Sequence, residues 1–468
     1  MKSTNLLLGA LALLGLGLTA EARTFTVTAW RGETVAARVP DSCELGATPA
    51  GLEIRRGALQ KVDYAPAPGS LQRLALYDRV VWDDTLAGPR VVEIRVPADA
   101  KPGDYDCGMM RVTVLDRVLP PPKEWTFYLD LWQHPWAVAR MAKAKPFSKE
   151  HYAAMKPVWE LLATAGQKTI TVPILDQPWD HQCYDAYHSM FDGDDFSRFD
   201  EYVQFCLDCG LGPDISCYSL CPWTLGKTID EAELETRWGA FLDKFAAHVK
   251  AKGWFEHTLM SMDERAPEDV MKVAKFVQKH APGMRISMAG NRKPSDFKGI
   301  TIDVYSQVLF AHCVTPEFLA EAAARRAKGL VTTHYVCCGP TYPNTFMSSG
   351  PGEAFWLGAS PAFLGLDGFL RWAWNSWPQD PARDATYGDY WRAGDTFLCY
   401  PGGEPSWRFL ELRNGIIAAE KVRILKAKGL DDAAFKAVAA LHDVKKANDN
   451  ACNFPAIREK TLGLVNAR

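Results

Sequence analysis

The chain has 468 residues, which is too long for one ordinary hydrophobic core, so we expect at least two domains. Hydrophobic residues make up 47% of the sequence and charged residues 23%, as is usual for soluble globular proteins. The formal net charge of -3 excludes a strong global attraction to nucleic acid or acidic lipid, and we expect no nucleic-acid partner.

The first residues have the pattern of an export signal. Lys2 precedes an apolar run over residues 6–18, and Ala20-Glu21-Ala22 is a small-x-small cleavage site, which predicts a signal peptide over residues 1–22. The run is too short for a stable membrane span, although an uncleaved anchor is the alternative. No later segment has ~18 consecutive apolar residues, so we expect a secreted or periplasmic protein without an integral membrane segment after cleavage.

Residues 23–120 have the pattern of a β-sandwich. Alternating or β-branched runs cover residues 24–29, 91–96 and 110–115, and turns such as Lys101-Pro102-Gly103-Asp104 separate the strands. Pro120-Pro121-Pro122 follows and predicts a short, stiff linker.

Residues 123–390 alternate between strand and helix patterns, which predicts βα units and a parallel sheet. The expected strands are 126–132, 169–175, 214–220, 258–263, 285–289, 301–305, 330–336 and 369–375. The clearest helices are 149–165, 198–209, 229–252, 267–280 and 316–328. Eight such strands predict an α/β fold of the (β/α)8 TIM-barrel type, with a shortened or missing helix at 290–300. Residues 391–468, with helices at 406–428 and 431–448, are expected to pack on the barrel.

In such barrels the reactive groups lie at the carboxyl ends of the strands, and here these ends are rich in aromatic, amide and carboxylate groups. Ring faces for stacking and polar groups for hydroxyls are what a sugar site needs. The candidate substrate-binding residues are Trp179, Tyr218, Trp223, Tyr305, Tyr335, Arg371, Trp372, Trp374 and Asn375. Side chains alternate along a strand, so the last strand cannot turn all four of its candidates inward unless it ends early.

Asp263 and Glu264 at the end of the fourth strand are the candidate catalytic pair. Glycoside cleavage needs a proton donor and a group that stabilises the developing positive centre, and adjacent carboxylates suggest substrate assistance by a 2-acetamido group. One carboxylate then orients the acetamide N–H, and the other is the acid and base. Both can enter one pocket only if the strand ends or bulges there. The alternative is a solvated pair at a helix N-terminus.

The cysteines give no strong metal signal. The pairs Cys206/Cys209 and Cys217/Cys221 have spacings that resemble zinc ligands, but their expected positions favour buried thiols or an occasional disulfide. The proposed chemistry requires no metal and no organic cofactor.

Several segments together resemble glycoside hydrolase family 123, the β-N-acetylgalactosaminidases. These segments are Leu131-Trp132-Gln133-His134-Pro135, Met262-Asp263-Glu264-Arg265, Thr332-Thr333-His334-Tyr335-Val336-Cys337-Cys338, Pro343-Asn344-Thr345-Phe346, residues 367–375, Ala393-Gly394-Asp395 and Tyr400-Pro401-Gly402. The resemblance implies a β-sandwich ahead of a (β/α)8 barrel and a retaining, substrate-assisted mechanism. In it Asp263 positions the 2-acetamido group and Glu264 is the general acid/base. The implied partner is a glycan or glycolipid with a terminal 2-acetamido sugar.

Two alternatives remain open at the level of sequence. A glycosidase of other specificity would use a second, separate carboxylate, for which Asp176, Asp180 and Asp303 are candidates. A non-catalytic glycan-binding protein would keep the aromatic site and lack turnover.

Overall fold

The computed structural model describes residues 25–179, 184–220 and 230–467. The expected signal peptide and the candidates Asp180 and Trp223 lie outside the described residues.

The N-terminal part contains two sheets. One has the order β1 (Phe25–Arg31), β7 (Met110–Val118) and β6 (Gly103–Cys107), and the other has the order β2 (Thr34–Arg38), β5 (Arg90–Arg95), β3 (Glu53–Tyr64) and β4 (Leu74–Val81). Val27 and Val112 of the first sheet share one hydrophobic core with Val92 and Ile94 of the second. The two sheets therefore form the expected sandwich, in which alternate residues of each strand fill the space between them.

The described residues beyond this sandwich include a parallel sheet of eight strands. The strands are β8 (Tyr128–Leu131), β9 (Thr169–Pro173), β10 (Asp214–Tyr218), β11 (Thr258–Asp263), β12 (Arg285–Gly290), β13 (Val304–Val308), β14 (Val331–Tyr335) and β15 (Gly368–Arg371). They follow chain order, and β15 pairs with β8. Between β8 and β9 only a single bridge joins Leu129 to Gln167, so the barrel is nearly closed. The predicted barrel class is confirmed, although the sixth strand begins and ends about three residues later than expected.

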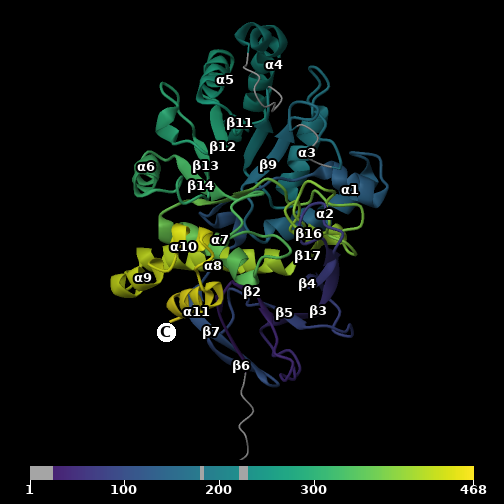
Figure 1. Cartoon of the computed structure of the whole chain (residues 1–468), viewed down its shortest axis with the longest axis vertical. Helices are drawn as coiled ribbons and strands as arrows, with labels where there is room; N and C mark the ends of the chain where they lie inside the picture. The colour runs from purple at the N-terminus through teal and green to yellow at the C-terminus, as the bar shows by residue number, and fades with distance from the viewer. Residues whose placement is uncertain (1–24, 180–183, 221–229, 468) are drawn as a thin grey trace, which may run out of the picture.

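Helices follow most strands and cover the outside of the barrel (Figure 1). They are α1 (Pro135–Ala142), α2 (Lys149–Ala163), α3 (Ser197–Asp208), α4 (Glu231–Ala251), α5 (Pro267–His280), α6 (Pro316–Arg326) and α7 (Pro351–Leu364). Ser148 and Thr315 cap α2 and α6 by accepting backbone N–H bonds, which marks these starts in the sequence. Between β12 and β13 only the short 3-10 turn η3 (Pro294–Asp296) is present, as the short gap predicted.

Helix α7 is absent from the sequence-based expectation because most of its residues are buried and its apolar residues do not follow one face. It packs against α8 (Trp407–Ala427), and two glycines make the close approach possible. A Cβ on Gly358 would lie 2.4 Å from the Leu412 carbonyl oxygen, and one on Gly415 would lie 2.1 Å from the Phe355 oxygen.

Helix α8 lies between the barrel and the sandwich, as Figure 1 shows. Its charged residues pair with the sandwich: Arg408 with Asp78 at 3.0 Å and Lys421 with Glu33 at 2.6 Å, with all four side chains buried. The rest of the C-terminal region consists of the hairpin β16 (Cys399–Tyr400) and β17 (Glu404–Pro405), α9 (Asp432–Ala439), α10 (Val444–Asn448) and α11 (Phe454–Val465). The expected single helix at 431–448 is wrong, because Asp443 caps a second helix by accepting the Lys446 N–H.

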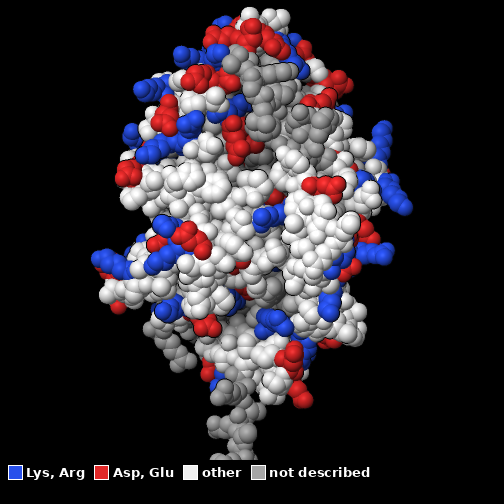
Figure 2. Space-filling view, in the orientation of Figure 1, with Lys and Arg blue, Asp and Glu red and all other residues white. Residues whose placement is uncertain are grey.

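The surface carries charges of both signs. On the face shown in Figure 2, acidic and basic side chains are interspersed, and no single-sign patch dominates. None of the helices in the described part of the chain is both long and apolar enough to cross a membrane.

Candidate active site

The chain conformation after β11 brings two neighbouring carboxylates to one side. Strand β11 ends at Asp263, and Glu264 has a left-handed backbone with φ +42°, which is uncommon for a residue other than glycine. The Glu264 N–H still donates to the Ala289 carbonyl of β12 over 2.9 Å. This local twist removes the usual alternation, so Asp263 and Glu264 line the same cavity.

This cavity lies at the carboxyl ends of the barrel strands and has a volume of about 180 Å³. Its lining combines the two carboxylates with aromatic, thiol and small apolar groups. The other lining residues are Trp132, Trp179, Ala289, Tyr335, Cys337, Cys338, Leu370, Trp372, Tyr390 and Trp391. A small, largely aromatic cavity with two convergent acids is a suitable site for a single sugar ring.

Asp263 is the half-buried member of the pair. Trp179 Nε1 donates to Asp263 Oδ2 over 2.8 Å. Burial, together with the neighbouring negative charge of Glu264, raises the pKa of Asp263 to about 8, against the opposing effects of Trp179 and Arg265. Asp263 is therefore largely protonated at neutral pH.

Glu264 is exposed to the cavity and is held from the opposite wall. The Tyr335 O–H at the end of β14 donates to Glu264 Oε1 over 2.5 Å. Burial and the charge of Glu264 raise the pKa of Tyr335 well above its ordinary value, so the phenol stays protonated and keeps donating. The two acids thus have different donors: an indole for Asp263 and a phenol for Glu264.

One aromatic wall is built in two layers. Trp132 and Trp179 line the cavity with their ring centroids 4.8 Å apart. Tyr218 at the end of β10 is buried behind them, 4.6 Å from Trp132 and 5.1 Å from Trp179. Tyr218 therefore supports the wall and does not line the cavity itself.

The other aromatic wall comes from residues that follow β15. Trp372 and Trp391 have ring centroids 4.8 Å apart, and Tyr390 lies 4.8 Å from Trp391. The Trp372 Nε1 donates to Asp395 over 3.0 Å, which holds the indole in place. Tyr390 is 76% exposed, so this wall extends outward from the cavity to solvent.

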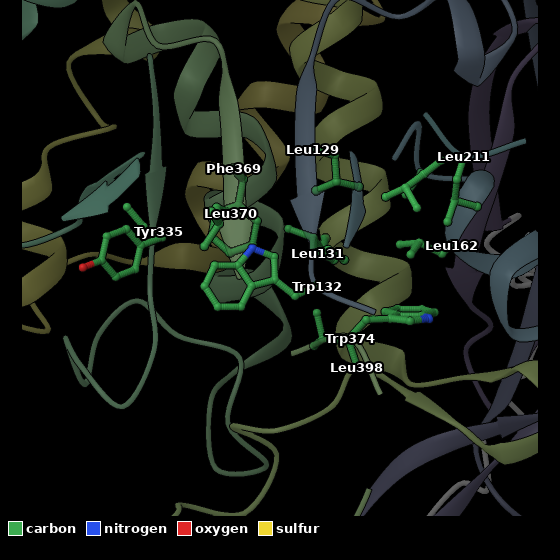
Figure 3. Close-up of a cluster of buried hydrophobic side chains, with 14 of the residues drawn as sticks. Leu129, Leu131, Trp132, Leu162, Leu211, Tyr335, Phe369, Leu370, Trp374 and Leu398 are labelled. Atoms are coloured by element: carbon green, nitrogen blue, oxygen red, sulfur yellow. The ribbon is translucent and has the colours of Figure 1, made fainter. Parts of the chain in front are cut away.

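The structure corrects the placement of three candidates on the last strand, because Arg371, Trp374 and Asn375 are fully buried and do not line the cavity. Arg371 forms an ion pair with Asp395 at 2.8 Å. The Asn375 side chain donates to and accepts from the backbone of His134, which ties the segment after β15 to the segment after β8. The indole of Trp374 packs on Phe409 and points away from Tyr335 (Figure 3).

Tyr305 also differs from the expectation. Its hydroxyl donates to the Arg292 carbonyl over 2.5 Å, and the buried ring does not line the cavity. Trp132, Tyr390 and Trp391 line the cavity but were not among the sequence candidates. A signal for them existed, since Trp132 directly follows the first strand, and Tyr390-Trp391 is an aromatic pair in an irregular segment.

The carboxylates considered as separate partners lie elsewhere. Asp176 is 72% exposed and does not line the cavity. Asp303 precedes β13, at the amino end of the strand, and accepts from the Ile286 N–H. A larger cavity of about 600 Å³ lies between the sandwich and the C-terminal helices, but its acids Glu33 and Glu411 form ion pairs with Lys421 and Arg458.

The possible metal-ligand pair Cys206 and Cys209 is part of the packing around α3. Both thiols are buried, and Cys206 accepts from Trp159 Nε1 over 3.3 Å. Burial raises the pKa of Cys209 to about 12, which keeps the thiol protonated. Among the described residues no three His, Cys, Asp or Glu side chains gather as a metal site.

Comparison with known proteins decides the family. The model of the glycoside hydrolase 123 catalytic domain matches residues 132–425, well over half of the chain. The chain belongs to glycoside hydrolase family 123. A family 123 glycoside hydrolase from Clostridium perfringens has a similar structure, with a TM-score of 0.76 and 22% sequence identity. The match covers 95% of this chain and 92% of that one, and the structural analysis of that enzyme concerned glycolipid glycan hydrolysis.

Other solved structures are more distant from this family 123 chain. The catalytic domain of a chitinase from Pyrococcus furiosus has a TM-score of 0.34 and 12% identity, over 64% of this chain and 97% of that one. A family 5 mannosidase from Rhizomucor miehei has a TM-score of 0.33 and 13% identity, over 63% of this chain and 94% of that one. Comparison with curated protein sequences gives no match.

Proposed function

We propose that this family 123 protein is a retaining glycosidase that removes a β-linked N-acetylgalactosamine from a glycan or glycolipid by substrate-assisted catalysis. The observation that carries the proposal is the adjacent pair Asp263 and Glu264, which lines one cavity with separate hydrogen-bond donors. No second acid from the alternatives Asp176 and Asp303 reaches this cavity. We assign the role of nucleophile to the substrate, whose 2-acetamido carbonyl oxygen can attack C1.

The two carboxyls hold different protonation states during the reaction. Before substrate binds, the proton favours Asp263, whose pKa is about 8. When a 2-acetamido sugar binds, its N–H donates to Asp263, which already accepts from the indole of Trp179. This second donor favours the ionised carboxylate. In the proposed mechanism Glu264 carries the proton that the leaving oxygen needs.

The reaction then proceeds in two steps. The acetamide oxygen attacks C1 while Glu264 gives its proton to the glycosidic oxygen, and the bond between C1 and that oxygen breaks. The Asp263 carboxylate accepts the N–H bond and stabilises the positive charge of the oxazolinium-like intermediate. Glu264 next takes a proton from water, whose oxygen attacks C1 and restores the acetamide. Two displacements at C1 retain the β configuration.

The aromatic walls determine where the parts of the substrate lie. The indoles of Trp132 and Trp179 lie beside Asp263 and provide ring faces for the sugar that is cleaved. Tyr390 and Trp391 extend outward, so the next sugar of the glycan stacks there. We also propose that the mature protein is exported, as the predicted signal peptide indicates.

Paired substrates test the mechanism. Aryl β-glycosides of N-acetylgalactosamine and of galactose differ at the 2-position, and we expect turnover only with the 2-acetamido substrate. A thiazoline analogue of the intermediate should inhibit competitively. Comparable turnover of both glycosides would refute substrate assistance. Aryl N-acetylglucosaminide in the same panel measures selectivity between the two sugar configurations.

Variants of the pair test the residue roles. Glu264→Gln should reduce kcat about 10²–10⁴-fold for a poor leaving group and leave binding of the thiazoline measurable. Asp432→Asn, a change on the distant helix α9 where Asp432 is 74% exposed, is the control for the removal of a carboxylate. Binding without any hydrolysis by the unmodified protein would favour the glycan-binding alternative.

A further inference from the structure

Two neighbouring thiols lie in the wall of the sugar cavity and take no part in the proposed hydrolysis. The Sγ atoms of Cys337 and Cys338 are 3.8 Å apart, and both residues line the cavity with Asp263 and Glu264. Cys338 is exposed to the cavity, whereas Cys337 is half-buried. The pair follows β14, which ends at Tyr335, after the single residue Val336.

The backbone around these thiols is held from the buried side. The Cys337 carbonyl accepts from Asn344 Nδ2 over 3.0 Å, and the Cys337 N–H donates to the Gly339 oxygen over 3.0 Å. Asn344 is fully buried and also accepts from Arg371. The position of the two sulfur atoms therefore depends on the barrel and not on a free surface loop.

We propose that Cys337 and Cys338 form a redox-active pair, that a low-molecular-weight disulfide oxidises it to a disulfide between the two neighbours, and that the oxidised form binds the sugar more tightly. Its effect on sugar binding rests on the proposed function, whereas the oxidation itself does not. An exported protein would meet oxidising conditions that favour such a bond.

The oxidation follows ordinary thiol–disulfide exchange. The Cys338 thiolate attacks one sulfur of the reagent, which forms a mixed disulfide and releases one reagent thiol. Cys337 loses its proton and attacks the Cys338 sulfur, which releases the second reagent thiol. The two cysteines lose two protons and two electrons, and the reagent disulfide gains them as two thiols. The sulfur atoms move from 3.8 Å to the bonded separation of about 2.05 Å.

The hydrogen bond between the two thiols makes Cys338 the attacking thiol. The hydrogen bond from Cys337 lowers the pKa of Cys338 to about 7, against burial and the negative charges of Asp395 and Glu264. The guanidinium of Arg371 also interacts with both sulfur atoms. A substantial fraction of Cys338 is thus ionised at neutral pH, which promotes its reaction with a disulfide.

The same ionisation links the redox state to sugar binding. A neutral sugar that covers the Cys338 thiolate removes water from the charge, and this loss of hydration weakens binding. The disulfide carries no charge and presents an apolar surface to the sugar ring. The oxidised protein should therefore bind the substrate better, and the difference should be largest above pH 7.

The first experiment detects the bond directly. The full-length protein is equilibrated with oxidised and reduced glutathione, and the free thiols are alkylated before peptide mass spectrometry. We expect the peptide with Cys337 and Cys338 to lose about two mass units and both alkylation sites. Cys338→Ser should abolish this product, and Cys313→Ser, at a half-buried thiol outside the cavity, should not. Alkylation of both thiols at every glutathione ratio would overturn the proposal.

The second experiment measures the effect on binding. At pH 8 we expect KM for an aryl 2-acetamido sugar to be about three- to tenfold lower for the oxidised protein, with kcat less affected. Cys338→Ala should have the low KM under both conditions, because it removes the thiolate. Equal KM values for the oxidised and reduced protein would overturn the link to binding. A disulfide in a protein without turnover would support the redox pair and refute the proposed function.

Discussion

Tyr335 donates its phenolic hydrogen to Glu264 over 2.5 Å, and this bond joins the end of β14 to the residue that follows β11. Strands β12 and β13 lie between these two strands in the sheet, so the bond crosses the mouth of the barrel. The orientation of the proposed acid thus depends on closure of the barrel and not on local sequence.

Removal of that donor should reduce catalysis without loss of the fold. We expect Tyr335→Phe to lower kcat about 10–100-fold, because Glu264 loses the bond that orients it toward the glycosidic oxygen. The loss should be larger for a poor leaving group than for an activated aryl group, which needs less protonation. Kinetics with a series of aryl leaving groups measure this. Tyr305→Phe, which removes a hydroxyl bonded outside the cavity, is the matched control. An equal loss for all leaving groups would contradict the orienting role.

Asp263 should lower the stability of the folded protein as the pH rises. Its pKa is about 8 in the folded protein and about 4 in the unfolded chain, so the folded state binds the proton more tightly. The carboxyl therefore destabilises the folded protein most above pH 8, where it is ionised in both the folded and the unfolded protein. We expect Asp263→Asn to raise the thermal midpoint by about 1–3 °C at pH 8–9 and to have little effect near pH 4. Thermal unfolding from pH 4 to pH 9 measures the difference.

The same Asp263→Asn protein should have lost most of its turnover, because the neutral amide no longer stabilises the positive intermediate. A gain in stability with a loss of rate is the pattern of a strained functional site. Asp432→Asn should change neither quantity by much. A variant that is less stable at pH 9 than the unmodified protein would contradict the raised pKa of Asp263.

Arg371 should be important for stability, since its guanidinium and the Asp395 carboxylate form a fully buried ion pair. We expect Arg371→Met to destabilise the protein by about 3–5 kcal/mol, because it leaves the Asp395 charge buried without its partner. The double variant Arg371→Met/Asp395→Leu should recover part of that loss. Denaturant unfolding measures both variants. If Arg371→Met instead left the stability unchanged and raised KM, Arg371 would be a substrate-binding residue, as the sequence predicted.

Tyr390 should affect only substrates that extend beyond the cleaved sugar. Tyr390 is 76% exposed next to Trp391, so Tyr390→Ala should leave stability unchanged. We expect KM for an oligosaccharide or glycolipid to rise about 3–10-fold, with little change for a small aryl glycoside. Tyr77→Ala, at another exposed tyrosine (42%) on β4 of the sandwich, is the control. The same change with both substrate types would argue against an outer sugar subsite.

Much of the barrel was predictable because its signals are local. The apolar runs of the eight strands, and caps such as Ser148 and Thr315, depend on neighbouring residues alone. Helix α7 was not predictable, since a helix buried on nearly all sides has no amphipathic period. The break between α9 and α10 was also missed, because neither Gly nor Pro marks it.

The amino-acid sequence by itself determined the barrel class and the place of Asp263 and Glu264 at a strand end, because hydrophobic period and strand order are properties of the chain. Only the tertiary structure decided which side chains reach the cavity. The left-handed backbone of Glu264 and the burial of Arg371, Trp374 and Asn375 arise from contacts between segments far apart in sequence. Such contacts leave no periodic trace along the chain, since each depends on how the closed barrel packs against its loops and the C-terminal helices.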